Sequence, residues 1–447
     1  MKRIGTVLLV VALLVGVLSA DMLSYARAAA QTAGDVNGDG TVNNRDLGLL
    51  QQWLGDWDVT IVGDADLNGD GRINNQDLGL LQQRLGGEEQ ESMYAATQYV
   101  NLGAPAAKHY PSDYLARCAW DMILFEDRLY VGCGDYSQNS GDAPVLSCPL
   151  DDLGNWTVEA ILPDEQVGRF YDYNGVLTIP GFDPVGAPAR GNYYELVDGV
   201  WQIRTVLPYG LHNFDVVWFE GRLYAAVGAN RGESPIAYTE DGVTYDTLPL
   251  YKGGQPIATD NSNVIRSMNL YVLGGNLYAD FWYEDEDSYR STFEMYRYNE
   301  REDRFEFTAD LKTATHGGLY SSAGLPLWEK ESLGGRMFLT TGYLYYTTDF
   351  VKYTPLEMPH GAVVYDMMAY GGRLYLLTAY EKSGAYQVTV YSVNAANPTA
   401  LRTEATYTHS LMPTAFAVNA DHFFIGMGNW YGVGSVGNGT ILQWKRK

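Results

Sequence analysis

From about Tyr99 to Lys447 the chain alternates short apolar runs with polar turns, and no stretch of any length shows helical periodicity. β-Branched and aromatic residues fill these runs, with Gly, Asp and Asn between them. Short alternating runs bounded by such turn residues are typical of β-strands. The pattern therefore predicts an all-β domain over residues 99–447.

Hairpin-like stretches recur seven times in this region. They begin at Phe125, Tyr173, Phe219, Leu273, Leu333, Tyr370 and Asn419. The spacings between their Leu, Met or Phe positions are 48, 46, 54, 60, 37 and 49 residues. Periods of about 40–50 residues with four strands per unit are typical of propeller blades. We therefore predict a seven-bladed β-propeller. The seventh repeat ends at residues 439–444 without an outer strand, and we predict that residues 99–102 supply this strand and close the ring.

The Gly-Gly-x-Leu-Tyr hairpins of this region resemble those of kelch-like propellers. The stretch Thr239-x-Asp-Gly-x-Thr-Tyr245 resembles the Asp-box turn of sialidase-like propellers. A single copy of that turn indicates blade geometry, and it does not imply sialidase chemistry.

The N-terminal 30 residues have the pattern of a secretory signal. Lys2 and Arg3 precede an apolar run from Val7 to Leu18, which is short for a membrane span. Small-x-small patterns at residues 26–30 predict cleavage there and a mature chain that begins near Gln31. An uncleaved anchor is the alternative.

Residues 34–86 contain one motif written twice, with every matched pair 31 residues apart. Oxygen-bearing side chains alternate along each copy around a central Gly, at Gly40 and Gly71, as in calcium-binding loops. Leu47, Leu50 and Leu54 then follow at helical spacing, as do their counterparts in the second copy. We predict two calcium ions, one in each loop, with Thr41 and Arg72 contributing backbone carbonyls. The predicted ligands are Asp35, Asn37, Asp39, Thr41, Asn43 and Asp46 in the first loop, and Asp66, Asn68, Asp70, Arg72, Asn74 and Asp77 in the second.

This doubled loop–helix unit closely resembles a type I dockerin module. The resemblance implies a module over residues 31–87 and binding to a cohesin domain of a scaffold protein in a cellulosome-like, extracellular assembly. The polar composition after the module predicts a linker over residues 88–98. The cohesin-reading positions implied by the family are Asn44, Arg45, Gln51, Gln52, Asn75, Gln76, Gln82 and Gln83. The hydroxyl pair usual at two of these positions is absent, which leaves cohesin specificity open. The near-symmetry suggests that either helix can dock.

The composition of the chain excludes some classes of binding partner. The net charge of −24 argues against nucleic acid and anionic membranes, which reward basic patches. Thirty-five Tyr and ten Trp are consistent with sugar-stacking platforms as well as with core packing. Cys118, Cys133 and Cys148 are too few for a disulfide framework, so we expect buried thiols, with one bridge between Cys133 and Cys148 as the alternative.

Counting back eight residues from each hairpin position gives the predicted innermost strands. The residues found there are Asp121, Arg169, Asp215, Asn269, Glu329, Asp366 and Ala415. Five His precede the same strands, namely His109, His212, His316, His360 and His409. If this ring of polar residues lines a central funnel, convergent groups of this kind predict a binding site for a sugar or uronate. The alternative is structural, because an inner-strand Asp can bond the backbone of the neighbouring blade.

For the functional alternative we select catalytic and ligand-binding candidates. The catalytic candidates are Asp121, Asp215, Asp366, His212 and His360, as acids, bases or nucleophiles. The ligand-binding candidates are Arg169, Asn269, Glu329, His316 and His409. No cofactor is evident for the propeller. Two functions remain open for it: a glycoside hydrolase or polysaccharide lyase acting on plant cell-wall polysaccharide, or a non-catalytic carbohydrate- or protein-binding propeller.

Overall fold

The computed structural model describes the backbone of most of the chain, in two units. The described residues are 34–39, 42–54, 59–67, 72–74, 77–81, 99–135, 140–186, 191–207, 212–228, 234–257, 263–285, 290–311, 329–340, 342–429 and 434–446. Contacts divide the chain into a unit of residues 1–93 and a unit of residues 94–447. The expected signal peptide and linker lie outside the described residues. Within these ranges no helix has the length and apolarity needed to cross a membrane.

The N-terminal unit is built on the doubled loop. Helix α2 (Asn44–Leu54) follows the first loop, and residues 77–81 are helical after the second. Val36, Leu50, Ala65 and Leu81 form a buried core to which both copies contribute. The backbones of the two copies pair directly, because the amide of Asp64 donates to the carbonyl of Asp35. A Cβ at Gly63 would lie 1.7 Å from that carbonyl oxygen, so only Gly allows the approach.

The C-terminal unit is all-β, as the alternating pattern predicts, and all seven expected hairpins form. These hairpins are β2 (Asp121–Phe125) with β3 (Arg128–Gly132), β6 (Tyr171–Tyr173) with β7 (Val176–Pro180), β10 (His212–Phe219) with β11 (Arg222–Gly228), β16 (Asn263–Leu273) with β17 (Asn276–Asp285), β20 (Glu329–Leu333) with β21 (Arg336–Thr340), β24 (Val363–Tyr370) with β25 (Arg373–Lys382), and β28 (Met412–Val418) with β29 (His422–Gly428). Three of the turns are Gly-Gly pairs in which both φ angles are positive, a conformation that favours Gly.

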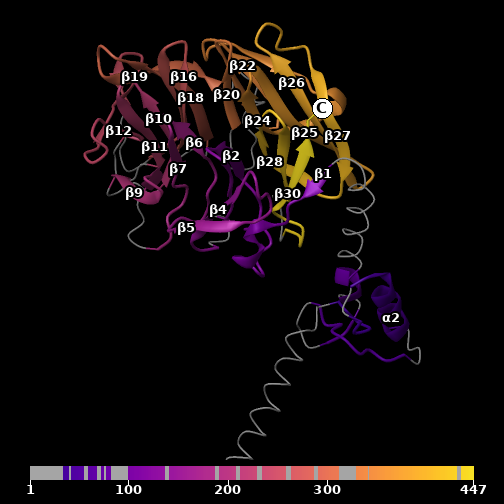
Figure 1. Ribbon diagram of the computed structural model, residues 1–447. Coiled ribbons are helices and arrows are strands. Elements are labelled where there is room, and N and C mark those ends of the chain that lie inside the picture. The colour runs from indigo at the N-terminus through magenta and orange to yellow at the C-terminus, as the bar shows by residue number, and fades with distance from the viewer. Residues whose placement is uncertain are drawn as a thin grey trace, which may run out of the picture. The chain divides into compact units, whose positions relative to one another are not determined.

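The outer strands complete the sheets. They are β4 (Ala143–Pro149), β5 (Thr157–Leu162), β8 (Gly191–Val197), β9 (Val200–Leu207), β12 (Ile236–Thr239), β13 (Asp246–Thr247), β18 (Arg290–Asn299), β19 (Arg304–Asp310), β22 (Leu344–Thr347), β23 (Tyr353–Leu356), β26 (Ala385–Asn394), β27 (Arg402–His409) and β30 (Thr440–Lys445). Short 3₁₀ turns, η1 (Pro105–Lys108) and η2 (Pro359–Gly361), lie between sheets. The sheets surround a common centre as the blades of a β-propeller (Figure 1).

The prediction of seven separate blades is wrong. Five separate four-stranded sheets are present among the described residues, and the third and fourth hairpins belong to one ten-stranded sheet. The reason is that Gly228 at the end of β11 pairs with Arg266 of β16 and joins the two repeats. A short hairpin of β14 (Leu250–Lys252) and β15 (Gln255–Pro256) extends this sheet, because β14 pairs in parallel with β19. Sequence periodicity gives the number of repeats, but it does not show which neighbouring repeats pair their strands in one sheet.

The predicted closure of the ring is confirmed. Strand β1 (Tyr99–Asn101) pairs antiparallel with β30, with Tyr99 opposite Trp444 (Figure 1). The ring of Tyr407 packs 5.5 Å from that of Tyr99 and 5.3 Å from that of Trp444. These three aromatics are buried in the core between the last two blades. Much of the aromatic content is therefore packing.

Two further sequence expectations have clear outcomes. Cys118, Cys133 and Cys148 are buried free thiols. In the turn at Thr239, the carboxylate of Asp241 accepts the amides of Val243 and Thr244, and these bonds lower its pKa to about 2. Asp349 makes the same pair of bonds in the turn after β22, so the Asp-box-like turn occurs twice among the described residues.

Candidate functional site

Each predicted calcium loop is closed by its last Asp. Both carboxylate oxygens of Asp46 accept backbone amides, from Asn37 at 3.0 Å and from Asn43 at 2.8 Å. Asp77 does the same in the second copy, where it accepts the amides of Leu67 and Asn74. Both carboxylates are fully buried. Each loop is thus wrapped around one central carboxylate.

The residues present fit a hard cation. Oδ1 of Asp35 and Oδ1 of Asn37 both accept the amide of Asp39, so donor oxygens from alternate loop positions converge. A set of carboxylate and amide oxygens suits Ca²⁺, which takes six to eight oxygen ligands. Thr41, Asn68 and Asp70 lie outside the described residues, so the complete ligand set of each ion stays a prediction.

The surface expected to read a cohesin is exposed where the structure describes it. Arg45, Gln51 and Gln52 are exposed on α2 beside Trp53, whose side chain is also 37% exposed. The side chain of Asn44 and residues Asn75, Gln76, Gln82 and Gln83 lie outside the described part. Exposed polar groups around an indole suit a protein interface.

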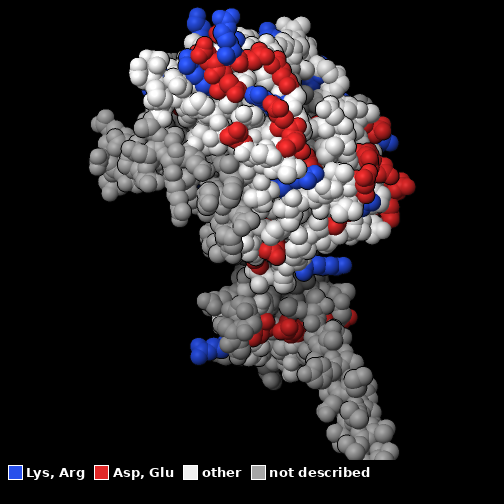
Figure 2. All heavy atoms as spheres, turned by 90° about the vertical axis from the view of Figure 1, so that its left-hand side faces the viewer, with Lys and Arg blue, Asp and Glu red and all other residues white. Residues whose placement is uncertain are grey.

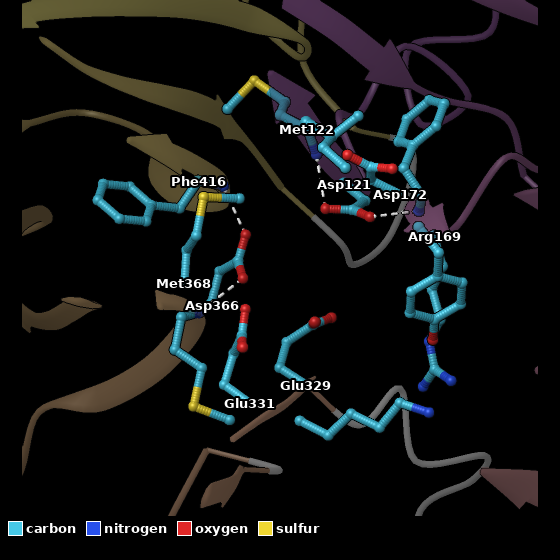
Figure 3. A pocket seen from close by; sticks show the side chains of 14 residues that line it. Asp121, Met122, Arg169, Asp172, Glu329, Glu331, Asp366, Met368 and Phe416 are labelled. Atoms are coloured by element: carbon cyan, nitrogen blue, oxygen red, sulfur yellow. Dashed lines mark hydrogen bonds between the residues drawn. The ribbon is translucent and has the colours of Figure 1, made fainter. Parts of the chain in front are cut away.

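In the propeller, four of the predicted inner-strand residues line one central cavity of about 250 Å³ (Figure 3). These are Asp121, Arg169, Glu329 and Asp366. Glu331, which the sequence count missed, points into the same cavity beside Glu329. Glu331 lies two positions after Glu329 in β20, and side chains two positions apart in a strand point to the same face. This period of two could have indicated Glu331 from the sequence. These four residues, found by counting back from the hairpins, come from four different blades.

The three predicted Asp join neighbouring blades. Each accepts the amide of the residue that follows it and one amide from the next inner strand, with donor–oxygen distances of 2.5 to 3.0 Å. The amides from the next strand are those of Phe170 for Asp121, Leu270 for Asp215 and Phe416 for Asp366. These contacts support the structural alternative for all three, and a catalytic role for them stays a prediction.

Asp215 does not line the cavity but lies fully buried in a charged network. It accepts hydrogen bonds from the Tyr171 hydroxyl and from Lys330, and Arg169 lies 3.7 Å away. Lys330 also donates to the carbonyl of Leu270 at 2.6 Å. Asn269 is likewise buried and donates to Asp280, and Ala415 lies in the core. The ring predicted from the sequence is therefore divided between cavity and scaffold.

The size of this cavity argues against a sugar polymer in it. Five carboxyl groups line it against two cations, Arg169 and Lys330. Burial raises the pKa of Glu329, and it raises the pKa of Glu331 to about 7. A raised pKa favours the uncharged carboxyl, so the argument rests on size: ligand pockets usually measure about 300–1,000 Å³, and this cavity is smaller. A site for a polysaccharide is therefore better sought outside the central cavity.

The described His residues lie apart from the cavity. His109 contacts the carbonyl of Asp142, His360 packs on Tyr380 at 5.2 Å, and buried His409 accepts the amide of Leu411. His316 lies outside the described residues. His212 differs from these three, because it lies in a polar cluster.

This cluster, which we call the His212 rim, consists of Asp183, His212, Arg266 and Trp282. Nδ1 of His212 lies 3.0 Å from the carbonyl oxygen of Phe182 and 3.4 Å from Oδ1 of Asp183. The guanidinium of Arg266 lies over the indole of Trp282, 5.4 Å from the ring centroid. Burial, together with nearby Arg266, lowers the pKa of His212. Sequence reasoning found His212 but missed the other three residues.

A larger groove of about 720 Å³ lies at the hairpin end of the strands, between Phe219 and β18–β19. Charges of both signs line it, and Arg304 pairs there with Glu302 and, at 2.7 Å, with Glu306. Figure 2 shows acidic and basic side chains intermixed on this side of the propeller. Because charges of both signs lie side by side, the groove has no charge preference that would indicate a ligand.

Comparison with known proteins found a family match for the first unit and a set of similar solved structures. Residues 33–86 match the Dockerin type I domain family. No curated protein matches the chain. Among solved structures, the chain is similar to a PL25 ulvan lyase bound to a saccharide (13% identity, 79% of this chain, 95% of that chain, TM-score 0.42) and to the polysaccharide lyase Uly1 (7%, 79%, 98%, 0.45). It is also similar to the propeller domain of the Trilobed protease from Pyrococcus furiosus (10%, 74%, 95%, 0.42). At these identities the likeness concerns the fold alone.

Proposed function

We propose that this protein is a secreted component of a cellulosome-like assembly. Its N-terminal module docks to a cohesin in a calcium-dependent way, and its β-propeller acts on plant cell-wall polysaccharide. The observation that carries the proposal is the doubled loop closed by Asp46 and Asp77, in a segment that matches the Dockerin type I domain.

The propeller's part in this function rests on the His212 rim. An imidazole of lowered pKa, a guanidinium and an indole lie at one end of the strands. Convergent polar groups beside an aromatic platform suit the recognition of a sugar. The central cavity is small, so it does not compete for this role.

Docking is expected to be symmetric. Changing Gln51 and Gln52 to Ala in the full-length protein should weaken cohesin binding by less than about tenfold, and so should the same change at Gln82 and Gln83. The physical reason is that either helix offers the same polar surface. Changing all four should abolish binding, as measured by titration calorimetry with a panel of cohesins in calcium.

A Lys352→Ala change at an exposed site of the propeller serves as the control and should leave cohesin binding unaltered. If one Gln pair alone destroys binding, a single helix carries the interface. If the protein with all four Gln binds no cohesin of the panel, the docking proposal itself fails.

A further inference from the structure

Four carboxyl groups from three inner strands share the central cavity of the propeller (Figure 3). This carboxyl cluster consists of Asp121 in β2, Glu329 and Glu331 in β20, and Asp366 in β24. The cavity measures about 250 Å³, so side chains from separate blades are confined to one small space. Asp172 also lines the cavity, but it is exposed and accepts an amide of its own hairpin turn, so it stands apart from the cluster.

The cations described at this cavity are too few to balance the carboxyl cluster. Lys330 bonds the carboxylate of Asp215, and Arg169 lies 3.7 Å from the same carboxylate. Tyr171 donates its hydroxyl to Asp215, and burial raises the pKa of this phenol, so it adds no charge. Two cations thus serve the four groups of the cluster and Asp215 as well. Carboxyl groups confined in this way cannot all be ionised, so the cluster holds protons.

The surroundings of the cluster favour the uncharged carboxyl. Burial, together with the charge of Glu329, raises the pKa of Asp121 and that of Asp366. Burial also raises the pKa of Glu329, where Arg169 and Lys330 oppose the shift. The charge state of each member therefore depends on that of the others.

Glu331 is the member of the cluster that changes its charge near neutral pH. Burial raises its pKa to about 7, and the charge of Glu329 adds to this shift. The backbone amide of Ala369 in β24, that of Ser332 and the charge of Lys330 act in the opposite direction. Glu331 thus faces groups of its own strand and of the next blade.

Two members of the cluster also join neighbouring repeats. Asp121 accepts the amide of Phe170 at 2.7 Å, and Asp366 accepts the amide of Phe416 at 2.5 Å. Each of these bonds links one inner strand to the start of the next repeat. Repulsion within the cluster therefore acts directly on the junctions that hold the ring together.

We propose that the carboxyl cluster is a proton-dependent lock of the propeller ring, which holds the blades together at acidic pH and weakens as the pH rises past neutral. A carboxyl group whose pKa is higher in the folded than in the unfolded protein binds more protons when folded, so its contribution to stability falls as the pH rises. This loss begins above about pH 4, the usual pKa of an unfolded carboxyl group. For Glu331 it extends to about pH 7. Above that pH the ionised groups repel one another across the cavity.

Denaturant unfolding of the full-length protein in calcium, at pH values from 5 to 8, tests this lock. The equilibrium constant for unfolding of the propeller should rise with pH. Glu331→Gln keeps the shape of the protonated side chain without its charge, so it should reduce this rise by at least about tenfold, since one pKa unit corresponds to a factor of ten. At pH 8 the variant should be more stable than the unchanged protein, whereas at pH 5 the two should be equally stable.

Glu329→Gln is the second variant and should act in the same direction. Glu381→Gln, at an exposed position of β25, is the matched control and should leave the pH dependence unaltered. The comparison between variants is decisive, because burial also raises the pKa of Asp164, to about 8, and lowers that of His212, both outside the cluster. An unaltered pH dependence in both Gln variants of the cluster would overturn the proposal. Lower stability of both variants than of the unchanged protein at pH 8 would overturn it as well.

Discussion

Removal of calcium from the full-length protein is expected to abolish cohesin capture and to unfold residues 34–86, while the propeller stays folded. The two loops concentrate buried carboxylates such as Asp46 and Asp77 within about fifty residues. Without the ion these charges repel, and the binding free energy that supports folding of the module is lost. Cohesin affinity should fall by at least about 100-fold, equivalent to about 2.7 kcal/mol.

Scanning calorimetry of the full-length protein checks this result. A low-temperature transition of the module should disappear with chelator and return with excess calcium, and the propeller transition should not move. Asp46→Ala should reproduce half of the effect, because it removes the closing carboxylate of one loop. A module that keeps its transition and its cohesin binding in chelator would contradict the calcium assignment.

Replacing Lys330 by Met is expected to lower the free energy of unfolding of the propeller by about 3–5 kcal/mol. Lys330 bonds the fully buried Asp215 and the carbonyl of Leu270. Burial lowers the pKa of Lys330, and the nearby Asp215 carboxylate opposes this shift. Its removal leaves a carboxylate buried without its main cation, since Arg169 lies 3.7 Å away at the edge of the network.

Denaturant unfolding measures this cost. Lys352→Met, at an exposed lysine, is the control and should change stability by less than about 0.5 kcal/mol. The double change Lys330→Met with Asp215→Asn should recover at least about 1 kcal/mol, because the uncompensated charge is gone. Equal stability of Lys330→Met and the unchanged protein would show that the pair contributes nothing.

Local patterns predicted much of the fold. The positions of all seven hairpins follow from apolar alternation and turn residues, and the closing strand follows from the missing outer strand of the last repeat. The number of separate blades did not follow, because the pairing of Gly228 with Arg266 joins two repeats through residues 38 positions apart. Whether strands of two neighbouring repeats pair depends on the twist of the sheets and on loop length. The period of the sequence carries no information on either.

The site was predicted less completely, for a related reason. Counting along equivalent strands found the cavity residues Asp121, Arg169, Glu329 and Asp366, since a repeated fold puts equivalent positions on one level. The count could not tell a cavity residue from Asp215, whose burial depends on Lys330 of another blade. It also missed Arg266 and Trp282, because their relation to His212 exists only through the pairing of β10, β11, β16 and β17.

The most direct test of the account is a single surface experiment in which immobilised cohesin captures the full-length protein in calcium and a soluble plant cell-wall polysaccharide such as xylan then flows across it. The account predicts capture, followed by binding of the polymer and appearance of its cleavage products in the outflow, with both lost when chelator releases the protein. Capture without any binding or cleavage of the polymer would contradict the role proposed for the propeller. Failure of capture in calcium by every cohesin tested would contradict the role proposed for the module.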